Sequence, residues 1–183
     1  MVVTPSNIKD CLIIQPKVIT DERGYFMESF NEKGFQAATG LDVHFVQDNQ
    51  SFSTKGVLRG LHYQTGESAQ AKLVRVLTGE VLDVVVDIRP GSPTFGEYLA
   101  VKLSAENQTQ MFIPRGCAHG FLVTSETATF FYKCDNFYDR NSEGGIRYND
   151  PSININWEFA ESDLIISEKD RLLPLLDNAK KVW

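Results

Sequence analysis

The chain has few cysteines, and none of them has the spacing that marks a cysteine motif. Its three cysteines, Cys11, Cys117 and Cys134, lie far apart in the sequence, and no CxxC pair occurs. A zinc knuckle and a disulfide framework are therefore excluded as organising elements. Isolated free thiols usually pack in a core, so we expect three buried cysteines in a protein of the reducing cytoplasm.

Long apolar runs and excess positive charge are also missing. The sequence has no stretch of the roughly 18 apolar residues that a membrane-spanning helix needs, and its first residues lack the pattern of a signal peptide. A net charge of -6 argues against general nucleic-acid binding. We therefore predict neither a membrane nor a nucleic-acid partner, although a few local Arg and Lys side chains can still bind a small anion.

No repeat, low-complexity tract or long linker divides the chain. Its 183 residues, 42% hydrophobic and 23% charged, suffice for one domain with a substantial core. We predict that residues 1–183 form that single domain.

Short apolar or alternating runs are what the sequence does contain, at roughly ten-residue spacing, which is typical of a sandwich or barrel. Turn residues separate them, as at Asp21–Gly24 and Arg89–Pro93. The predicted strands are Cys11–Ile14, Tyr25–Phe30, Phe45–Phe52, Val57–Tyr63, Lys72–Leu77, Val81–Ile88, Tyr98–Leu103, Gln110–Ile113, Gly120–Val123 and Ala128–Cys134. We predict a mainly β fold, an antiparallel double-sheet jelly roll with short helices at its margins.

Two segments interrupt the strand pattern and favour helices. One covers Glu32–Thr39 and stops at Gly40, and the other begins near Ser167 and continues through Leu176 despite Pro174. Ser167 and Asp170 have the spacing of a helix capping box, in which the carboxylate is used at the helix terminus.

The segment from Leu58 to Gln64 holds the residues best suited to chemistry. It places Arg59 and His62 in an otherwise apolar strand, and Lys72 follows closely. A histidine with cations nearby can take a proton and hold an anionic substrate. Taken alone, the segment favours a structural histidine on a half-buried strand.

Other segments leave similar alternatives open. Gln47, Asn49 and Ser51 share one strand face, which fits a ligand site or a solvated edge strand. Phe26 and Glu28 follow a turn that contains Arg23, and an aromatic beside a carboxylate suits a nucleotide base as well as an ordinary amphipathic strand.

A second histidine, His119, follows the turn at Pro114–Gly116. Its small neighbours would let a ligand approach the backbone, or they mark a tight corner of the sheet. A metal site would need more, because a metal-binding cupin usually offers a His-x-His pair, and residues 60 and 64 are Gly and Gln. We therefore predict no metal. Tyr132, in an apolar strand, is either a core tyrosine or a proton donor.

Taken together, these segments resemble the dTDP-4-dehydrorhamnose 3,5-epimerase family, from about Asp10 to Leu176. Each motif is weak alone, and their order and spacing make the resemblance specific. The motifs are Asp21–Gly24, Phe45–Asn49, Leu58–His62, Ala71–Arg75, Asp87–Arg89 with Ser92–Gly96, Ile113–Pro114 and Ala118–Phe121. The resemblance implies a cupin-type jelly roll, a homodimer, a dTDP-4-keto-6-deoxy-hexose substrate and no cofactor.

The resemblance also implies roles for individual residues. His62 matches the general base, Asp170 the carboxylate that orients it, Tyr132 the proton donor and Lys72 the cation beside the C4 oxygen. The implied substrate-binding residues are Arg23, Phe26, Glu28, Gln47, Asn49, Arg59, His119, Glu143 and Lys169.

Chemistry explains why these residue types are needed. A C4 ketone acidifies the protons at C3 and C5, a base removes one, and an ammonium stabilises the enolate oxygen. Reprotonation from the other face inverts the carbon. Two alternatives remain, a related enzyme that inverts one centre or isomerises the ketone, and a cupin that only binds the sugar nucleotide.

Overall fold

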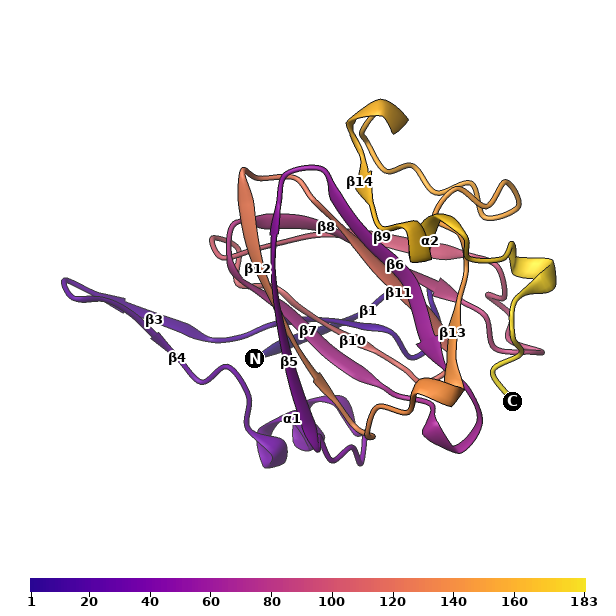
Figure 1. The fold of residues 1–183 in the computed structure, drawn as a ribbon. Coiled ribbons are helices and arrows are strands. Elements are labelled where there is room, and N and C mark those ends of the chain that lie inside the picture. Colours follow the sequence, from indigo (N-terminus) through magenta and orange to yellow (C-terminus); the bar gives the residue numbers. More distant parts are fainter.

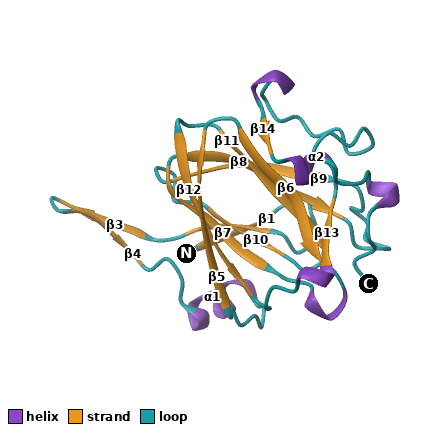
Figure 2. Cartoon of the chain, in the orientation of Figure 1, coloured by secondary structure: helices purple, strands orange, loops and turns teal.

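Residues 1–183 are described by a computed structural model, in which two sheets lie face to face (Figures 1 and 2). The first sheet has six strands in the order β1 (Val2–Pro5), β2 (Leu12–Gln15), β10 (Gln110–Ile113), β7 (Lys72–Thr78), β12 (Thr127–Cys134) and β5 (Gln47–Thr54). The second runs β13 (Glu143–Gly145), β6 (Val57–Gln64), β11 (Cys117–Val123), β8 (Glu80–Asp87) and β9 (Tyr98–Ser104), with β14 (Ile165–Ile166) beside β6.

The pairing confirms the predicted antiparallel double sheet. All ten predicted strands are present, β10 with the predicted bounds and the other nine with shifted ends. The one parallel pairing is that of β14 with β6. The sequence pattern did not predict β1, β13, β14 or β3 (Val18–Asp21). β3 pairs with β4 (Gly24–Met27) in a hairpin that projects from the sandwich at the left of Figure 1.

Three apolar clusters hold the layers together. The central cluster lies between the sheets and combines β7 side chains such as Val74 with β8 side chains such as Val85, both fully buried. The outer face of the second sheet is covered by the C-terminal segment, through residues such as Trp157. The strands therefore bury one face in the sandwich and part of the other under flanking segments, as their near-continuous burial requires.

The helix α1 (Glu32–Thr39) has the predicted bounds. The Asn31 side chain accepts a hydrogen bond from the Gly34 N–H at 2.9 Å, and Gly40 closes the helix in the left-handed conformation. Phe35 is 1% exposed and packs on Phe112 of the first sheet. The helix therefore covers the outer face of that sheet.

The prediction of the second helix is wrong in its length, because α2 covers only Glu168–Arg171. Ser167 caps it as predicted, by accepting a hydrogen bond from the Asp170 N–H at 3.1 Å. Leu173 precedes Pro174, and the residue before a proline is disfavoured in the helical conformation. The chain therefore leaves the helix and afterwards forms only one short 3₁₀ turn, at Leu176–Asn178.

A close backbone contact between β6 and β11 sets the direction of the site residues. A Cβ on Gly60, whose φ is +126°, would lie 2.6 Å from the Cα of Gly120, so glycine is required there. The pairing of the two strands shifts at this point, between His119 and the next paired residue. In a regular strand Arg59 and His62 would point to opposite faces. The bulge turns both toward the same cavity.

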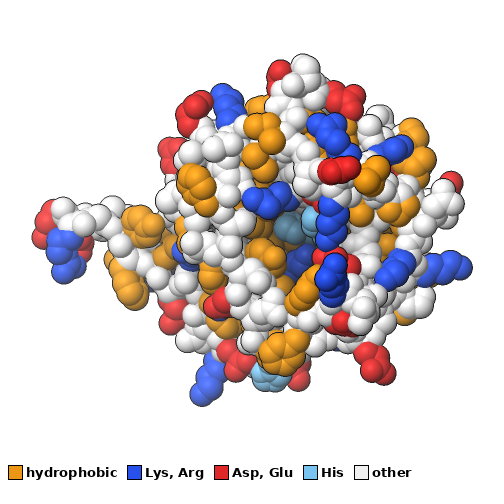
Figure 3. Space-filling model, in the orientation of Figure 1, with side chains coloured by type: hydrophobic (Ala, Val, Ile, Leu, Met, Phe, Trp, Pro, Cys, Tyr) orange, Lys and Arg blue, Asp and Glu red, His pale blue; other side chains and the backbone are white.

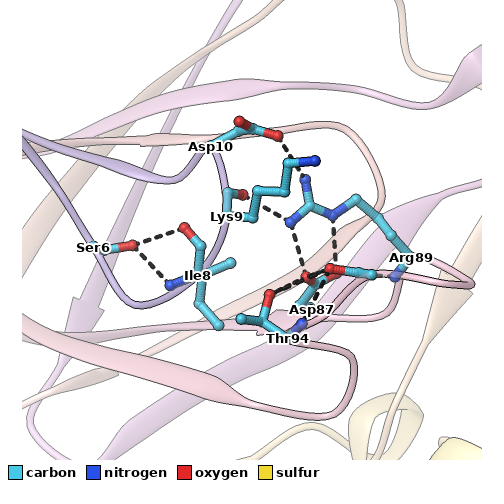
Figure 4. A network of polar contacts seen from close by, with 8 residues as sticks. Ser6, Ile8, Lys9, Asp10, Asp87, Arg89 and Thr94 are labelled. Atoms are coloured by element: carbon cyan, nitrogen blue, oxygen red, sulfur yellow. Dashed lines mark hydrogen bonds and ion pairs between the residues drawn. The ribbon is translucent and has the colours of Figure 1, made fainter.

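Asp87, at the end of β8, forms a polar network that fastens the N-terminal segment to the sandwich (Figure 4). It is fully buried and accepts hydrogen bonds from Nε and Nη2 of Arg89 at 2.9 and 2.8 Å and from the Thr94 hydroxyl at 2.6 Å. Arg89 donates in turn to the Lys9 carbonyl at 2.7 Å. Burial alone would raise the pKa of Asp87, but these donors lower it to about 2.

We expect Gly120→Ala to destabilise the protein by about 1–3 kcal/mol, as overpacking does. Its Cβ would lie 2.7 Å from the Arg59 carbonyl and 3.0 Å from Leu61. Urea unfolding measures the effect, and Gly34→Ala is the control because its nearest contact is 3.5 Å away. Gly34→Ala should leave the free energy of unfolding unchanged or raise it slightly, because alanine favours a helix more than glycine does. A fully stable Gly120→Ala protein would show that the two strands are not confined as described.

We expect Asp87→Asn to remove a pH-dependent part of the stability. Because the folded pKa lies at about 2, below the ordinary value of 3.8, this contribution is present above pH 4 and is lost as the pH falls toward 2. The shift corresponds to roughly 2 kcal/mol. Urea unfolding from pH 2 to 7 should show a lower, flatter profile for the variant. Glu106→Gln, at an exposed carboxylate, should keep the wild-type slope.

Candidate active site

A cavity of about 650 Å³ opens between the two sheets, and we call it the main pocket. Its walls come from β5, β7 and β12 of the first sheet, from β6 and β11 of the second, and from β14 and α2. The lining residues are Asn49, Gln50, Ser51, Val57, Leu58, Arg59, His62, Lys72, His119, Gly120, Phe121, Phe130, Tyr132, Ile165, Ile166, Ser167, Lys169 and Asp170. Figure 3 shows a hollow in this face of the molecule with histidine and Lys or Arg side chains gathered around it.

His62 and Asp170 form a hydrogen-bonded pair across 108 residues of sequence. The Nε2 atom of His62 lies 2.8 Å from Oδ1 of Asp170, and the other carboxylate oxygen accepts the Gly60 N–H at 3.1 Å. Burial works to raise the pKa of Asp170, but His62 and the Gly60 N–H lower it more. The charged carboxylate therefore holds the imidazole, which is 38% exposed, in one orientation.

This geometry revises the capping-box interpretation of Asp170. The backbone N–H of Asp170 is capped by Ser167, while its carboxylate turns to β6 instead of back to the helix terminus. The short helix α2 is thus a support that presents Asp170 to His62.

His119 forms a second histidine–carboxylate pair, with Asp83 of β8. Its Nε2 lies 3.0 and 2.9 Å from the two carboxylate oxygens, and both residues are buried. Burial lowers the pKa of His119, and the Asp83 charge acts in the opposite direction. His119 pairs with His62 in the ladder between β11 and β6, so both rings face the main pocket.

Lys72 and Tyr132 lie together on the opposite wall, formed by the first sheet. The ammonium of Lys72 is 5.7 Å from the centroid of the Tyr132 ring. Burial lowers the pKa of Lys72 and raises that of Tyr132. The phenol therefore stays protonated at neutral pH, and it faces the wall that carries His62.

The remaining predicted binding residues of the pocket lie around these groups. Arg59 is held by a hydrogen bond from its Nε to the Ser53 hydroxyl at 3.1 Å. Asn49 lines the pocket, and Gln47 stands behind it, donating to its side-chain oxygen at 3.2 Å. The shared face predicted for Gln47 and Asn49 is therefore present, although only Asn49 lines the cavity.

Glu143 and Lys169 form an ion pair at the rim, with an Nζ to Oε2 distance of 2.8 Å. The bond to Lys169 lowers the pKa of Glu143 and raises that of Lys169. Lys169 also lines the main pocket, whereas Glu143 lines a neighbouring hollow.

The structure does not bring Arg23, Phe26 and Glu28 to the pocket of their own chain. Arg23 and Phe26 lie on the projecting hairpin, where the Arg23 side chain is 84% and Phe26 is 70% exposed. Glu28 lies just beyond β4 and accepts a hydrogen bond from Asn31. Phe30, at the end of the same predicted strand, is not exposed like these residues, because it packs against Phe35.

The small residues around His119 do not all serve a ligand. A Cβ on Gly116 would collide with Arg89 and Trp183, so side chains of the protein already fill that space. Ala118 is fully buried. Gly120, the third small neighbour of His119, is the one of the three that lines the main pocket.

The two pocket histidines bind different carboxylates, and the structure holds no group of three or more His, Cys, Asp or Glu side chains placed to bind a metal ion. All three cysteines are free and buried, as predicted. No helix has the length and hydrophobicity that crossing a membrane requires.

Sequence reasoning missed two residues that position site groups. Asp83 was treated as part of an apolar strand, although a lone carboxylate between Leu82 and Val84 was a signal that it has a buried partner. Ser53, which holds Arg59, carried no comparable signal.

Comparison with known proteins agrees with this geometry. Residues 5–178 match the family model described as dTDP-4-dehydrorhamnose 3,5-epimerase. The enzyme of that name from Salmonella typhimurium is 54% identical over 98% of this chain and 97% of its own length. The crystal structure of the Elizabethkingia anophelis enzyme has a TM-score of 0.93 at 54% identity and covers 99% of this chain and 98% of its own.

A second solved structure contains a ligand. It is the dTDP-6-deoxy-D-glucose-3,5-epimerase from Legionella pneumophila in complex with dTDP-4-keto-L-rhamnose. It has a TM-score of 0.92 at 50% identity and covers 96% of this chain and 93% of its own.

Proposed function

The chain belongs to the dTDP-4-dehydrorhamnose 3,5-epimerase family, and we propose that its main pocket holds the sugar between His62 and Tyr132. The protein is an isomerase that inverts C3 and C5 of dTDP-4-dehydro-6-deoxy-D-glucose, giving dTDP-4-dehydro-L-rhamnose in dTDP-L-rhamnose biosynthesis. The residue roles, the use of residues 1–183 as one catalytic domain, the homodimer and the cytoplasmic location are parts of the proposal.

His62 is the general base. The observation that carries this role is the 2.8 Å bond from its Nε2 to Asp170, because a carboxylate bonded to one ring nitrogen fixes the tautomer that leaves the other nitrogen free to accept a proton. With Nε2–H donated to Asp170, Nδ1 takes the proton from C3 or C5. Asp170 then faces the imidazolium that forms and stabilises its charge.

Lys72 stabilises the enolate and Tyr132 delivers the new proton. The Lys72 ammonium belongs to none of the chain's ion pairs, so it is available to the oxygen at C4, where negative charge develops. Tyr132 stands on the wall opposite His62 and, with a raised pKa, is protonated and able to donate. Proton removal on one face and return on the other invert the carbon.

Binding of the diphosphate relies on guanidinium groups, which suit phosphate oxygens. Arg59 lies in the main pocket, and Asn49, Gln47, His119, Glu143 and Lys169 complete the binding residues. Arg23 and Phe26 of the hairpin, and Glu28 just after it, come from a second copy of the chain. The proposal rests on their exposure and on the projection of the hairpin away from its own pocket (Figure 1).

We expect His62→Ala to abolish the wash-in of deuterium at C3 and C5 when the 4-keto sugar nucleotide is incubated in D2O. Tyr132→Phe keeps the base but lacks the phenol proton, so it should retain some exchange while net inversion falls. Both losses should appear mainly in kcat. Proton NMR of the sugar measures exchange and inversion together.

The same experiment tests the alternatives. Label at only one carbon with the wild-type protein would indicate inversion at a single centre, and tight binding without label would indicate a binding protein. If His62→Ala exchanges both protons at the wild-type rate, the assignment of the base is wrong.

Shared sites predict complementation between two inactive variants. An Arg23→Ala/Phe26→Ala protein lacks the hairpin contacts, and a His62→Ala protein lacks the base. Mixed dimers contain one intact site, so random subunit exchange should restore about a quarter of the wild-type activity for a symmetric dimer. Light scattering establishes the mass. A monomer with full activity, or mixed dimers without activity, would contradict sharing.

A further inference from the structure

A second, smaller cavity adjoins the main pocket, and we call it the side hollow. It measures about 280 Å³ and is lined by Glu143, Leu173, Pro174, Asn178 and Lys180, by the β13 glycines, and by His62 and Lys169. His62 and Lys169 also line the main pocket. His62 therefore lies at the border of two cavities.

The proposed chemistry, on which this inference rests, creates a need for a second opening. Each inversion transfers one proton from the sugar to His62 and one from Tyr132 to the sugar. The same His62 must lose its proton before it can act on the second carbon. While the sugar nucleotide fills the main pocket and excludes water from it, that proton cannot leave by the way the substrate entered.

We propose that the side hollow is a water-filled proton exit, through which His62 returns its proton to solvent while the substrate stays bound. The N–H bond formed on the imidazole breaks, and the proton passes to a water molecule and from there to bulk solvent. The histidine lone pair is restored. Tyr132 takes up one proton at the opposite wall, so one proton leaves and one enters for each inverted carbon.

The size and surface of the side hollow fit this use. A water molecule occupies about 30 Å³ in the liquid, so the cavity holds several. Pro174, Asn178 and Lys180 are exposed, which connects the hollow to solvent. Two glycines of β13 form part of its wall, where a Cβ would collide with Tyr63 or Leu173.

The polar groups at the boundary also fit. Glu143 and Lys169, paired at 2.8 Å, stand where the two cavities meet. Asn178 and Lys180 add further polar groups to the wall of the hollow. A cavity that offers such hydrogen-bonding partners holds water, whereas an apolar one stays dry.

The test is to fill the side hollow without touching the main pocket. Asn178 lines only the hollow and is exposed, so Asn178→Trp can occupy it with little effect on the fold. Asn178→Ala leaves the hollow open. Asp177→Trp is the matched control, since this exposed neighbour lies in the same 3₁₀ turn and lines neither cavity.

Rapid quenching with enzyme in excess resolves the two inversions of one bound sugar. For Asn178→Trp we expect the first proton to be removed at the wild-type rate and the second inversion to slow by roughly tenfold or more, as when acid–base catalysis is impaired. The singly inverted sugar should then accumulate and be released under steady-state conditions. Asn178→Ala and Asp177→Trp should behave as the wild type.

If Asn178→Trp carries out the second inversion at the wild-type rate, the proton exit is overturned. Equal slowing of both inversions overturns it too, because filling the exit should leave the rate of the first inversion unchanged. These results leave the proposed function intact as long as the wild type inverts both centres. Failure of the wild type to do so, or exchange by His62→Ala, would overturn the proposed function instead. Thermal unfolding confirms that the three variants are folded.

Discussion

The backbones of β6 and β11 touch where Gly60 faces Gly120, and the arrangement of the site depends on this contact. A Cβ at either position would collide with the other strand. Because the two strands approach so closely, one extra residue of β6 is accommodated as a bulge. The bulge turns Arg59 and His62 to the same side, and it leaves the Gly60 N–H free to bond Asp170. One steric feature thus orients the Arg59 guanidinium, the His62 imidazole and the Asp170 carboxylate that is bonded to it.

The two histidine–carboxylate pairs of the pocket share chemistry but differ in access. His62 is partly exposed, and the carboxylate that holds it also accepts a backbone N–H. His119 and Asp83 are both buried, and burial lowers the pKa of the imidazole. A buried ring of this kind presents a fixed polar edge to a ligand. The difference in burial distinguishes the proposed base from the proposed binding group, which residue types alone do not.

Much of the fold could be predicted because it follows from local rules. Turn residues and alternation locate ten strands, and Gly40 marks the end of α1 because helix termination is a local interaction. The projecting hairpin could not be located in this way. Val18, Ile19, Tyr25 and Phe26 look like an ordinary amphipathic pair, yet all four are exposed, and no local pattern states whether such a surface is covered by its own chain.

The site was predictable in its residue types and less so in its geometry. His62, Lys72, Tyr132 and Asp170 all reach the main pocket, but their predicted roles came from the resemblance. Residue patterns alone favoured a structural histidine, a core tyrosine and a capping aspartate. Those interpretations describe each residue within its own segment, whereas the His62–Asp170 bond joins residues 108 positions apart. A long-range contact of this kind follows from the fold as a whole.

The chain's overall acidity and the cationic pocket have one physical explanation. A net charge of -6 is spread over the surface, where water and salt screen it. In the main pocket, Arg59, Lys72 and Lys169 converge on one cavity, while its carboxylates are bonded to partners. Asp170 is hydrogen-bonded to His62, and Glu143, at the rim, is paired with Lys169. Lys72 and Arg59 have no carboxylate partner in the pocket, so both cations remain available to an anionic ligand in an acidic protein.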